Sequence, residues 1–349
     1  MFFDKLIGAF SNNLAIDLGT ANTVVVAKGR GIIIDEPSVV AIKKSFLYSQ
    51  GSFPEIVAIG NEAKEMLGKT PMNLHAVRPL KEGVISDFDI AEIMIRDVIH
   101  RAHQRKNLIS PMVVICVPYG LTKVERKAVI ESAMNAGARE VYLVDEPLAA
   151  AIGVGINIYE PRGRLVVDIG GGTTEIGIVS LGGLVSSFSL KVAGDTFDLA
   201  IVSYLKHKHN ILISERVAER IKIEAGSALE LEKEISVSVS GREKFDGRLT
   251  TINISSVEIR EAISEPIKTI TRAIQNILED LPTELVGDIL DTGIVLTGGG
   301  ALIKNLDEFL TQEIKLPAYL AENPLTAVAL GTGAVLEDNN LLQNIARKF

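Results

Sequence analysis

Residues 14–27 read LAIDLGTANTVVVA, and residues 165–179 read LVVDIGGGTTEIGIV. Each stretch is an apolar run that ends near an aspartate, then a turn rich in glycine and threonine, then a second run with β-branched residues. This pattern is typical of a β-hairpin with a polar tip. Because one supersecondary unit occurs twice, we expect two related α/β domains.

A third glycine-rich turn, residues 298–300, follows the apolar run 294–297 and precedes a helical pattern over 301–312. The order strand, turn, helix is typical of α/β proteins. Apolar residues recur at spacings of three and four, which predicts helices, over residues 91–104, 123–136, 196–207, 214–224 and 256–278. Residues 235–254 instead alternate, which predicts an antiparallel hairpin. We therefore expect two α/β cores with smaller α+β insertions.

Composition narrows the classes of protein to consider. The 349 residues suffice for about two domains with their own cores. With 36 basic against 44 acidic residues, the net charge of -8 excludes nucleic acid as an expected partner. The single cysteine, Cys116, lies in an apolar run and is predicted to be a core residue of a strand, so no intrachain disulfide is expected. No stretch of 18 uncharged apolar residues predicts a transmembrane helix.

The two hairpin tips have the composition of phosphate-binding turns. In DLGTANT (17–23) and DIGGGTTE (168–175), small residues let backbone N–H groups approach phosphate oxygens, and hydroxyls add donors. Asp17 and Asp168 would hold Mg²⁺, which prefers carboxylate and water oxygens. Either tip alone could be an ordinary tight hairpin with an Asx turn. Two tips with the aspartate in register favour phosphate binding.

Five motifs in order resemble the nucleotide-site motifs of the actin, Hsp70 and sugar-kinase superfamily. They are DLGTANT (17–23), VDEPLAAAIG (144–153), DIGGGTTE (168–175), LTGGGAL (296–302) and ALGTGAV (329–335). Within the superfamily the chain is most similar to the MreB family of bacterial actin homologues, also through DEPSVVA (35–41) and AERIK (218–222). The resemblance covers the chain from about residue 12 to residue 335. It implies an actin-like ATPase fold of the α/β class, in which two related RNase H-like domains face a nucleotide cleft and each carries a smaller α+β subdomain.

The resemblance also implies domain boundaries. They are an amphipathic N-terminal membrane segment 1–10; subdomain IA at 11–33, 79–151 and 326–349; IB at 34–78; IIA at 152–195 and 258–325; and IIB at 196–257.

The residues implied to bind ATP or ADP fall on these motifs. Asp17 and Asp168 would face Mg²⁺ through water. The phosphates would lie between two groups of residues, Gly19, Thr20, Ala21 and Asn22 on one side and Gly170, Gly171 and Gly172 on the other. Glu146 falls at the position that orients the attacking water, and Thr173 would help to place it. The alternative for Glu146 is a helix-start acid beside Pro147, stabilised by the helix dipole.

Adenine is implied to lie between the helix that carries Glu219 and Lys222 and a turn formed by Gly298, Gly299, Gly300 and Ala301. The spacing of three places Glu219 and Lys222 on one helix face, where they could contact ribose hydroxyls and the base edge. A solvated ion pair is the alternative. The chain departs from the family at Ala193, since members commonly read GGD where this chain has Ala193-Gly194-Asp195.

Two apolar features point to a membrane surface. One side of a short N-terminal helix would carry Phe2, Phe3, Leu6, Ile7 and Phe10, as expected of an interfacial anchor. The alternatives are a frayed end or an extra core strand. Leu108 and Ile109 form an apolar pair in a polar loop, where MreB proteins carry a membrane-inserting loop; loop packing is the alternative.

The implied function is a slow, Mg²⁺-dependent ATPase that forms ADP and phosphate and polymerises with ATP. Its antiparallel double filaments would lie on the inner face of the cytoplasmic membrane, as a scaffold for rod shape and peptidoglycan synthesis. Its partners would be other copies of the chain, the membrane and membrane proteins of the cell-wall elongation machinery. Two alternatives remain: a sugar-type kinase, which should have an aspartate base and larger insertions, and an Hsp70-like chaperone, which should have a peptide-binding domain after the nucleotide core.

Overall fold

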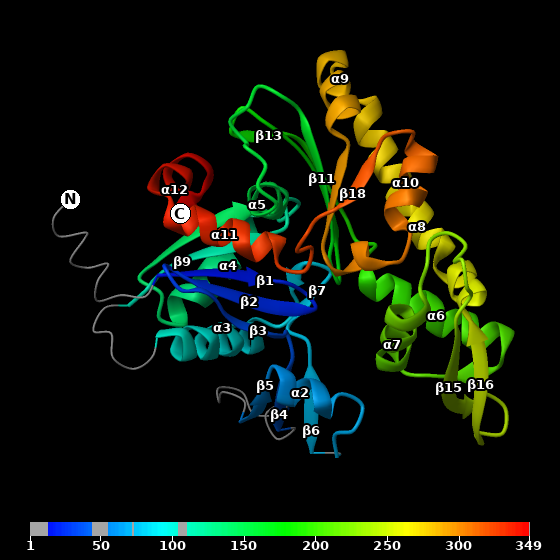
Figure 1. Ribbon diagram of the computed structural model, residues 1–349. Coiled ribbons are helices and arrows are strands. Elements are labelled where there is room, and N and C mark those ends of the chain that lie inside the picture. The colour runs from blue at the N-terminus through cyan, green and yellow to red at the C-terminus, as the bar shows by residue number, and fades with distance from the viewer. Residues whose placement is uncertain (1–12, 44–54, 72, 104–109, 349) are drawn as a thin grey trace. The chain divides into compact units, whose positions relative to one another are not determined.

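The computed structural model describes residues 13–43, 55–71, 73–103 and 110–348. The chain divides into two compact units (Figure 1). Unit 1 comprises Met1–Pro161, Val179–Val185 and Leu325–Phe349, and unit 2 comprises Arg162–Ile178 and Ser186–Pro324. The finer division into four subdomains stays a prediction.

Unit 1 is built on a six-stranded sheet with the order β19-β10-β9-β1-β2-β3. Its strands are β1 (Leu14–Leu18), β2 (Asn22–Ala27), β3 (Gly31–Pro37), β9 (Met112–Val117), β10 (Glu140–Asp145) and β19 (Arg347–Lys348). β1 pairs antiparallel with β2, which confirms the first predicted hairpin, and parallel with β9. β9 is a nearly continuous apolar run because it is buried on both faces. Cys116 is 1% exposed in this strand, as predicted.

Helices and two small sheets complete unit 1. The helices are α2 (Asn61–Met66), α3 (Phe88–His103), α4 (Lys123–Asn135), α5 (Glu146–Gly153), α11 (Ala327–Glu337) and α12 (Asn339–Ile345). The small sheets are formed by β4 (Val40–Lys43), β5 (Ile56–Ile59) and β6 (Leu74–Val77), and by β7 (Leu80–Lys81) and β8 (Val84–Ile85). The α4 N-terminus is fixed by a capping box in which Thr122 and Glu125 bind each other's backbone N–H.

Unit 2 is built on a five-stranded sheet with the order β13-β12-β11-β17-β18. Its strands are β11 (Arg164–Ile169), β12 (Thr174–Ser180), β13 (Gly183–Leu190), β17 (Ile294–Thr297) and β18 (Ala318–Leu320). A smaller sheet contains β14 (Ile211–Leu212), β15 (Ser236–Glu243) and β16 (Leu249–Ser255). β15 and β16 pair antiparallel, which confirms the hairpin predicted from alternation. The helices are α6 (Gly194–Lys208), α7 (Glu215–Ala225), α8 (Ser256–Glu279), α9 (Thr283–Thr292), α10 (Leu306–Ile314) and the 3₁₀ helix η2 (Gly299–Leu302).

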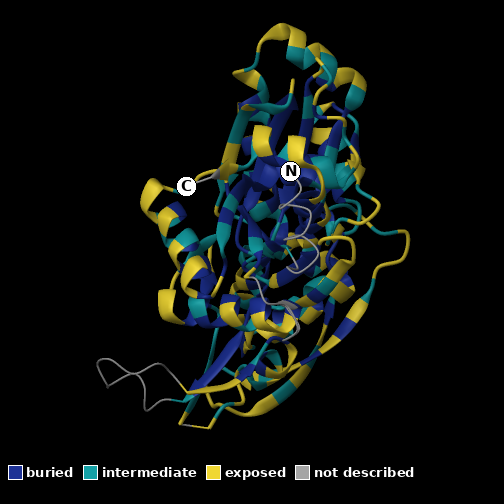
Figure 2. Cartoon of the chain, turned by 90° about the vertical axis from the view of Figure 1, so that its left-hand side faces the viewer, coloured by how far each residue is buried: buried dark blue, intermediate teal, exposed yellow. Residues whose placement is uncertain are grey.

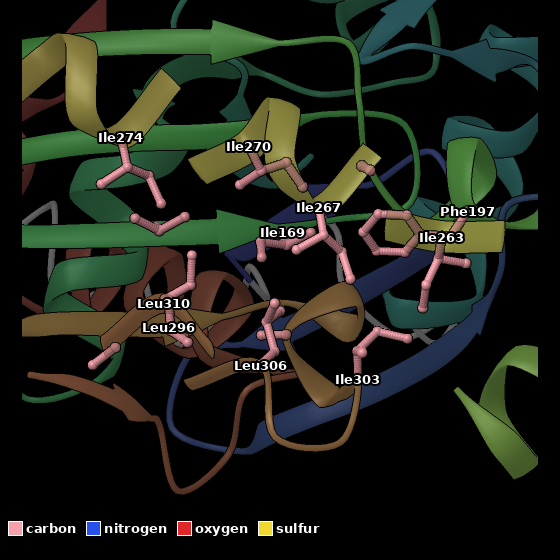
Figure 3. Packing of buried hydrophobic residues seen from close by; sticks show 14 of the residues in the cluster. Ile169, Phe197, Ile263, Ile267, Ile270, Ile274, Leu296, Ile303, Leu306 and Leu310 are labelled. Atoms are coloured by element: carbon pink, nitrogen blue, oxygen red, sulfur yellow. The ribbon is translucent and has the colours of Figure 1, made fainter. Parts of the chain in front are cut away.

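The core of unit 2 forms where α8 packs on the sheet. Figure 3 shows four isoleucines at helical spacing on α8, together with side chains from β11, β17 and α10. The labelled residues of this cluster include Ile263, Ile267, Ile270, Ile274, Ile169, Leu296 and Leu310. Burial of each isoleucine side chain stabilises the folded unit by about 1.5–3 kcal/mol. Figure 2 shows the corresponding pattern across the chain, with buried residues along the strands and exposed residues on outward helix faces.

One predicted helix was wrong in its extent. The pattern over 301–312 predicted a continuous helix, but the chain forms η2, leaves helical geometry, and starts α10 only at Leu306. Asn305 has φ of 59°, a left-handed conformation that asparagine tolerates better than most residues. The break is stabilised from outside the helix, because Lys304 O accepts a hydrogen bond from Ala228 N at 2.8 Å and Asn305 Nδ2 donates to Glu230 O at 3.3 Å.

Among the described residues, no helix combines the length and the apolarity that crossing a bilayer requires.

Two glycines allow α5 and α11 to cross at close range. A Cβ atom on Gly331 would lie 1.8 Å from Ala149 O, and one on Gly153 would lie 1.8 Å from Ala327 O. Both clashes are with backbone atoms, which cannot move aside as a flexible side chain can. The contact matters for the site because α5 begins at Glu146, and α11 also packs on β1.

We expect Gly331→Ala to lower the free energy of unfolding by about 3 kcal/mol or more, because overpacking here separates two helix backbones. Gly287→Ala is the control, since Gly287 lies in α9 with open space around its Cα and its replacement should stabilise by about 0.5–1 kcal/mol. Urea denaturation monitored by circular dichroism measures both changes. Equal stability of the Gly331→Ala variant and the wild type would contradict the close crossing.

Candidate functional site

The β1–β2 turn of unit 1 is held in shape by Ser38. Ser38 Oγ donates to Gly19 O at 2.6 Å and lies 2.8 Å from Thr23 Oγ1, while Ser38 N donates to Ala21 O at 2.9 Å. Ser38 is fully buried. Gly19 cannot be replaced freely, because a Cβ there would lie 2.7 Å from Asn22 O. Ser38 was not predicted to be a site residue, although it lies in the DEPSVVA motif.

Asp17 and Glu146 lie at one edge of the same sheet. β1, β9 and β10 are parallel neighbours, and Asp17 is in register with Cys116, which is in register with Val144. The carboxyl ends of these strands therefore meet at the edge where ligands bind in open α/β sheets. One strand, β9, therefore lies between the strand that carries Asp17 and β10, which leads into α5.

Glu146 is the first residue of α5 and is 8% exposed. Pro147 follows in the first helical turn, where its fixed φ suits a helix start. Asp145, the residue before Glu146, forms a buried ion pair with Arg126 at 2.8 Å and accepts from Arg347 at 3.3 Å. The helix-start interpretation and the predicted role with water are thus compatible, because Glu146 begins the helix and its side chain is buried at the carboxyl end of the sheet.

In unit 2 the β11–β12 turn is supported by the N-terminus of α6. Gly170 N donates to Thr173 O at 2.9 Å, which closes the turn. From α6, Gly194 N donates to Gly170 O at 3.1 Å and Asp195 N donates to Gly171 O at 2.8 Å. These bonds occupy turn carbonyls, so that electronegative oxygens are directed toward α6. The loop that carries Ala193 is therefore the support of the predicted phosphate turn.

Ala193 is compatible with this support. Its φ of -160° is an extended conformation that any residue adopts, and its side chain is fully buried in the core of unit 2. Gly194 is the position where space is short, because a Cβ there would lie 3.2 Å from Gly170 O. The departure from the family's glycine at position 193 thus adds a buried methyl group and leaves the contact with the turn intact.

The carboxylate of Asp168 is buried at the end of β11. Asp168 is 6% exposed, and its Oδ1 accepts a hydrogen bond from Thr297 Oγ1 at 2.7 Å. Burial raises the pKa of Asp168 to about 6, against the smaller lowering effect of the Thr297 hydroxyl. Thr297 is the residue of β17 in register with Asp168. Residues 298–301 of the LTGGGAL motif were predicted to contact adenine, whereas no role was predicted for Thr297.

The turn after β17 packs directly on the same strand end. Gly298 has φ of 82°, and a Cβ there would lie 2.9 Å from Asp168 Oδ1 and 2.3 Å from Ile169 O. A Cβ on Gly300 would lie 2.3 Å from Ile169 Cγ2. Unit 2 therefore brings residues 298–301 against the base of the β11–β12 turn.

Lys222 and Glu219 lie on one face of α7, as their spacing predicts, but Lys222 has protein partners. Its Nζ atom lies 2.9 Å from Asp198 Oδ1 and donates to Asp198 Oδ2 and to Gly194 O, both at 3.0 Å. The alternative of a solvated pair on α7 is wrong for Lys222, because its side chain is only 13% exposed and its carboxylate partner is on α6.

The predicted membrane residues lie outside the described part of the chain. They are Phe2, Phe3, Leu6, Ile7, Phe10, Leu108 and Ile109.

Comparison with known proteins gives one consistent result. Residues 11–344 match the family described as MreB/Mbl protein. The chain is 49% identical over 334 residues to the cell shape-determining protein MreB of Escherichia coli K12, covering 95% of both chains. It superimposes on MreB5 of Spiroplasma citri bound to AMPPNP with a TM-score of 0.88 at 36% identity, over 96% of this chain and 98% of that one. The ADP-bound structure of that protein gives 0.87 at 37% identity, over 93% and 96%. The predicted actin-like fold is thereby confirmed.

The raised pKa of Asp168 predicts a pH-dependent stability in the protein free of nucleotide and divalent cation. The folded state binds the proton more tightly than the unfolded state, whose aspartate pKa is about 3.9. This stabilisation is complete below about pH 4 and is lost as the pH rises through about 6. The wild type should therefore lose about 2–3 kcal/mol between pH 4 and pH 7.5 that Asp168→Asn, which stays neutral, does not lose.

Urea denaturation of both proteins at the two pH values measures this difference, and subtraction cancels the other titrating groups. Parallel pH profiles of the two proteins would contradict the raised pKa of the buried Asp168 carboxyl.

Proposed function

This chain belongs to the MreB/Mbl family, and we propose that it is an actin-like ATPase that assembles into cytoskeletal filaments and determines cell shape. The observation that carries the proposal is the pair of hairpins β1–β2 and β11–β12, each with a carboxylate at the strand end and a glycine turn after it. The family match over residues 11–344 favours this function over a sugar-type kinase or an Hsp70-like chaperone.

ATP and ADP are the proposed ligands. The related MreB5 of Spiroplasma citri has been solved with ADP and with AMPPNP, which supports a site that accepts two or three phosphates. The phosphates would be bound by two groups of backbone and hydroxyl donors, Gly19, Thr20, Ala21 and Asn22 on β1–β2 and Gly171, Gly172 and Thr173 on β11–β12. Gly170 would contribute by shaping the second turn, which its N–H closes. Glu219 and the turn 298–301 would bind the nucleoside.

Asp17 and Asp168 are proposed to hold Mg²⁺ through water. The fit rests on Asp168, whose buried carboxylate has the Thr297 hydroxyl as its neutral partner and a pKa of about 6. A neighbouring cation would favour its ionised form. When bound, Mg²⁺ would neutralise phosphate charge. Among the described residues no cluster of three or more histidine, cysteine or acidic side chains forms a metal cage, and magnesium in nucleotide sites needs only one or two carboxylates.

Glu146 is proposed to orient the water that attacks the γ-phosphate. In-line attack requires a positioned water and stabilised charge more than a strong base. The carboxylate at the start of α5 would accept a hydrogen bond from that water. Its burial limits competition from bulk solvent. Neither DLGTANT nor DIGGGTTE contains lysine or arginine. Slow turnover is part of the proposal because the resemblance to MreB proteins implies it.

The filaments are proposed to lie on the inner face of the cytoplasmic membrane as antiparallel pairs, together with membrane proteins of the cell-wall elongation machinery. The support is the sequence of residues 1–10 and the pair Leu108-Ile109. One short apolar segment binds a bilayer weakly, but many copies in one filament raise the effective concentration and thus the avidity.

We expect Glu146→Ala to reduce phosphate release about 100-fold or more while ATP still binds and filaments still form. Phosphate release and electron microscopy on lipid monolayers with Mg·ATP measure the two properties. Glu140→Ala is the matched control, since Glu140 lies at the opposite end of β10. Full phosphate release by the Glu146→Ala variant would remove Glu146 from the mechanism, and the absence of polymer from both proteins would argue against the cytoskeletal function.

Removal of residues 1–10 should weaken co-sedimentation of filaments with liposomes and leave ATP affinity unchanged, because no predicted nucleotide ligand lies in that segment. Equal sedimentation of the truncated and full-length proteins would refute the N-terminal anchor.

A further inference from the structure

We propose that Lys222 is a positioning residue for the phosphate-binding turn 170–173, and that Asp198, to which the sequence analysis gave no role, is the residue that holds it there. The proposal rests on the nucleotide site proposed above, and it gives Lys222, which the resemblance implied to be a nucleotide ligand, a different role in that site. A lysine three positions after Glu219 on a helix face suggests a ribose ligand, but the contacts of this lysine run to α6 instead.

The Lys222 ammonium is enclosed by oxygens of α6. Nζ lies 2.9 Å from Asp198 Oδ1 and donates at 3.0 Å to Asp198 Oδ2 and at 3.0 Å to Gly194 O. The side chains are 13% and 8% exposed. An ammonium has three N–H donors, and two of them are engaged in these bonds while the charge is paired. A nucleotide hydroxyl could reach only the remaining donor, on a side chain that is 13% exposed and already held by α6.

Gly194 connects the ion pair with the phosphate turn. Its carbonyl oxygen accepts from Lys222, and its N–H donates to Gly170 O at 3.1 Å. The next residue, Asp195, donates its N–H to Gly171 O at 2.8 Å. A Cβ at position 194 would lie 3.2 Å from Gly170 O, a tight contact, and 3.5 Å from Lys222 Nζ, so the glycine lies close to both the turn and the ammonium. Gly194 therefore connects Lys222 with the turn, because its carbonyl binds the ammonium and its N–H binds Gly170 O.

Asp198 is the group that keeps the lysine in this position. Three charged groups face its carboxylate: Lys222 and Glu219 from α7, and Asp195 from α6. Two of the three are like charges, so loss of Lys222 would leave an unfavourable cluster of carboxylates. Burial raises the pKa of Asp198 to about 6, with Lys222 acting in the opposite direction. Mild acid would therefore neutralise Asp198 and weaken its hold on the lysine.

The first test separates a positioning role from a ribose contact. Dissociation constants of full-length wild type and Lys222→Met are measured for ATP and for 2′,3′-dideoxy-ATP, which lacks both ribose hydroxyls. A positioning role predicts that both nucleotides bind about tenfold more weakly, as is usual when a supporting contact is removed, with an unchanged ratio of the two constants. A ratio that falls toward one, or unchanged affinity for ATP, would overturn the proposal.

The second test addresses Asp198. Asp198→Asn should weaken ATP binding about tenfold at pH 7.5, and the gap to the wild type should shrink as the pH falls below about 6, where the wild-type carboxyl is also neutral. Comparison of the two proteins at each pH cancels the titration of ATP itself. A gap that stays constant over this range would contradict the role of the Asp198 charge.

Two further variants keep the result interpretable. The double variant Asp198→Asn with Lys222→Met removes the unpaired buried cation, and it should bind ATP no more weakly than either single variant, because both act on one contact. Additive losses would overturn the proposal. Glu234→Gln is the control, since it breaks the partly buried Arg260–Glu234 pair of the same unit at 2.7 Å and should leave ATP affinity unchanged. If the wild type fails to bind ATP, the proposed function fails; if it binds and the variants bind equally well, only this inference fails.

Discussion

A carboxylate buried at the end of a parallel strand is the constraint around which unit 2 is arranged. Asp168 needs a hydrogen-bond donor, and Thr297 supplies it from the neighbouring strand in register. The residue that follows β17 must then be glycine, because a Cβ on Gly298 would lie 2.3 Å from Ile169 O and 2.9 Å from the Asp168 carboxylate. The motifs at 168–175 and 297–301 are therefore one structural solution, in which the acid, its donor and the glycine turn depend on each other.

Unit 1 also has an acid near the end of a strand and a turn after it, but different residues support them. Asp17 lies at the end of β1, and the turn after it is held by the buried hydroxyl of Ser38, which satisfies Gly19 O. The acid beside Glu146, Asp145, is neutralised by Arg126. The close crossing of α5 and α11 at two glycines fixes the helix that Glu146 begins. Related hairpins thus occur with unrelated supports, which is why the hairpins can be recognised in the sequence and the supports cannot.

The ion pair of Lys222 with Asp198 illustrates how a helix face is insufficient to assign a role. Spacing places Glu219 and Lys222 together on α7, and the structure agrees. The partner of the Lys222 ammonium is instead the carboxylate of Asp198, which lies on α6, 24 residues away in the sequence. The same pair connects α7 to the turn 170–173, so that groups proposed to contact the nucleoside and the phosphates are mechanically linked within one unit.

The sequence by itself determined the two hairpins, the buried strand around Cys116 and the alternating pair β15–β16, because these depend on local periodicity and on turn residues that few other sequences can replace. The actin-like fold was predicted from the resemblance of five motifs to a known superfamily, and the comparison with solved structures confirms it. Only the tertiary structure determined where a predicted helix is interrupted and which side chains pair with the residues of the candidate site. The helix predicted from residue 301 is broken near Asn305 because the segment 226–230 competes for its backbone. Thr297, Ser38, Arg126 and Asp198 are ordinary residues in the sequence, and they acquire roles through contacts between segments that lie far apart along the chain. Local patterns fix backbone conformation over a few residues, whereas compensation of a buried charge depends on whichever donor the fold brings near.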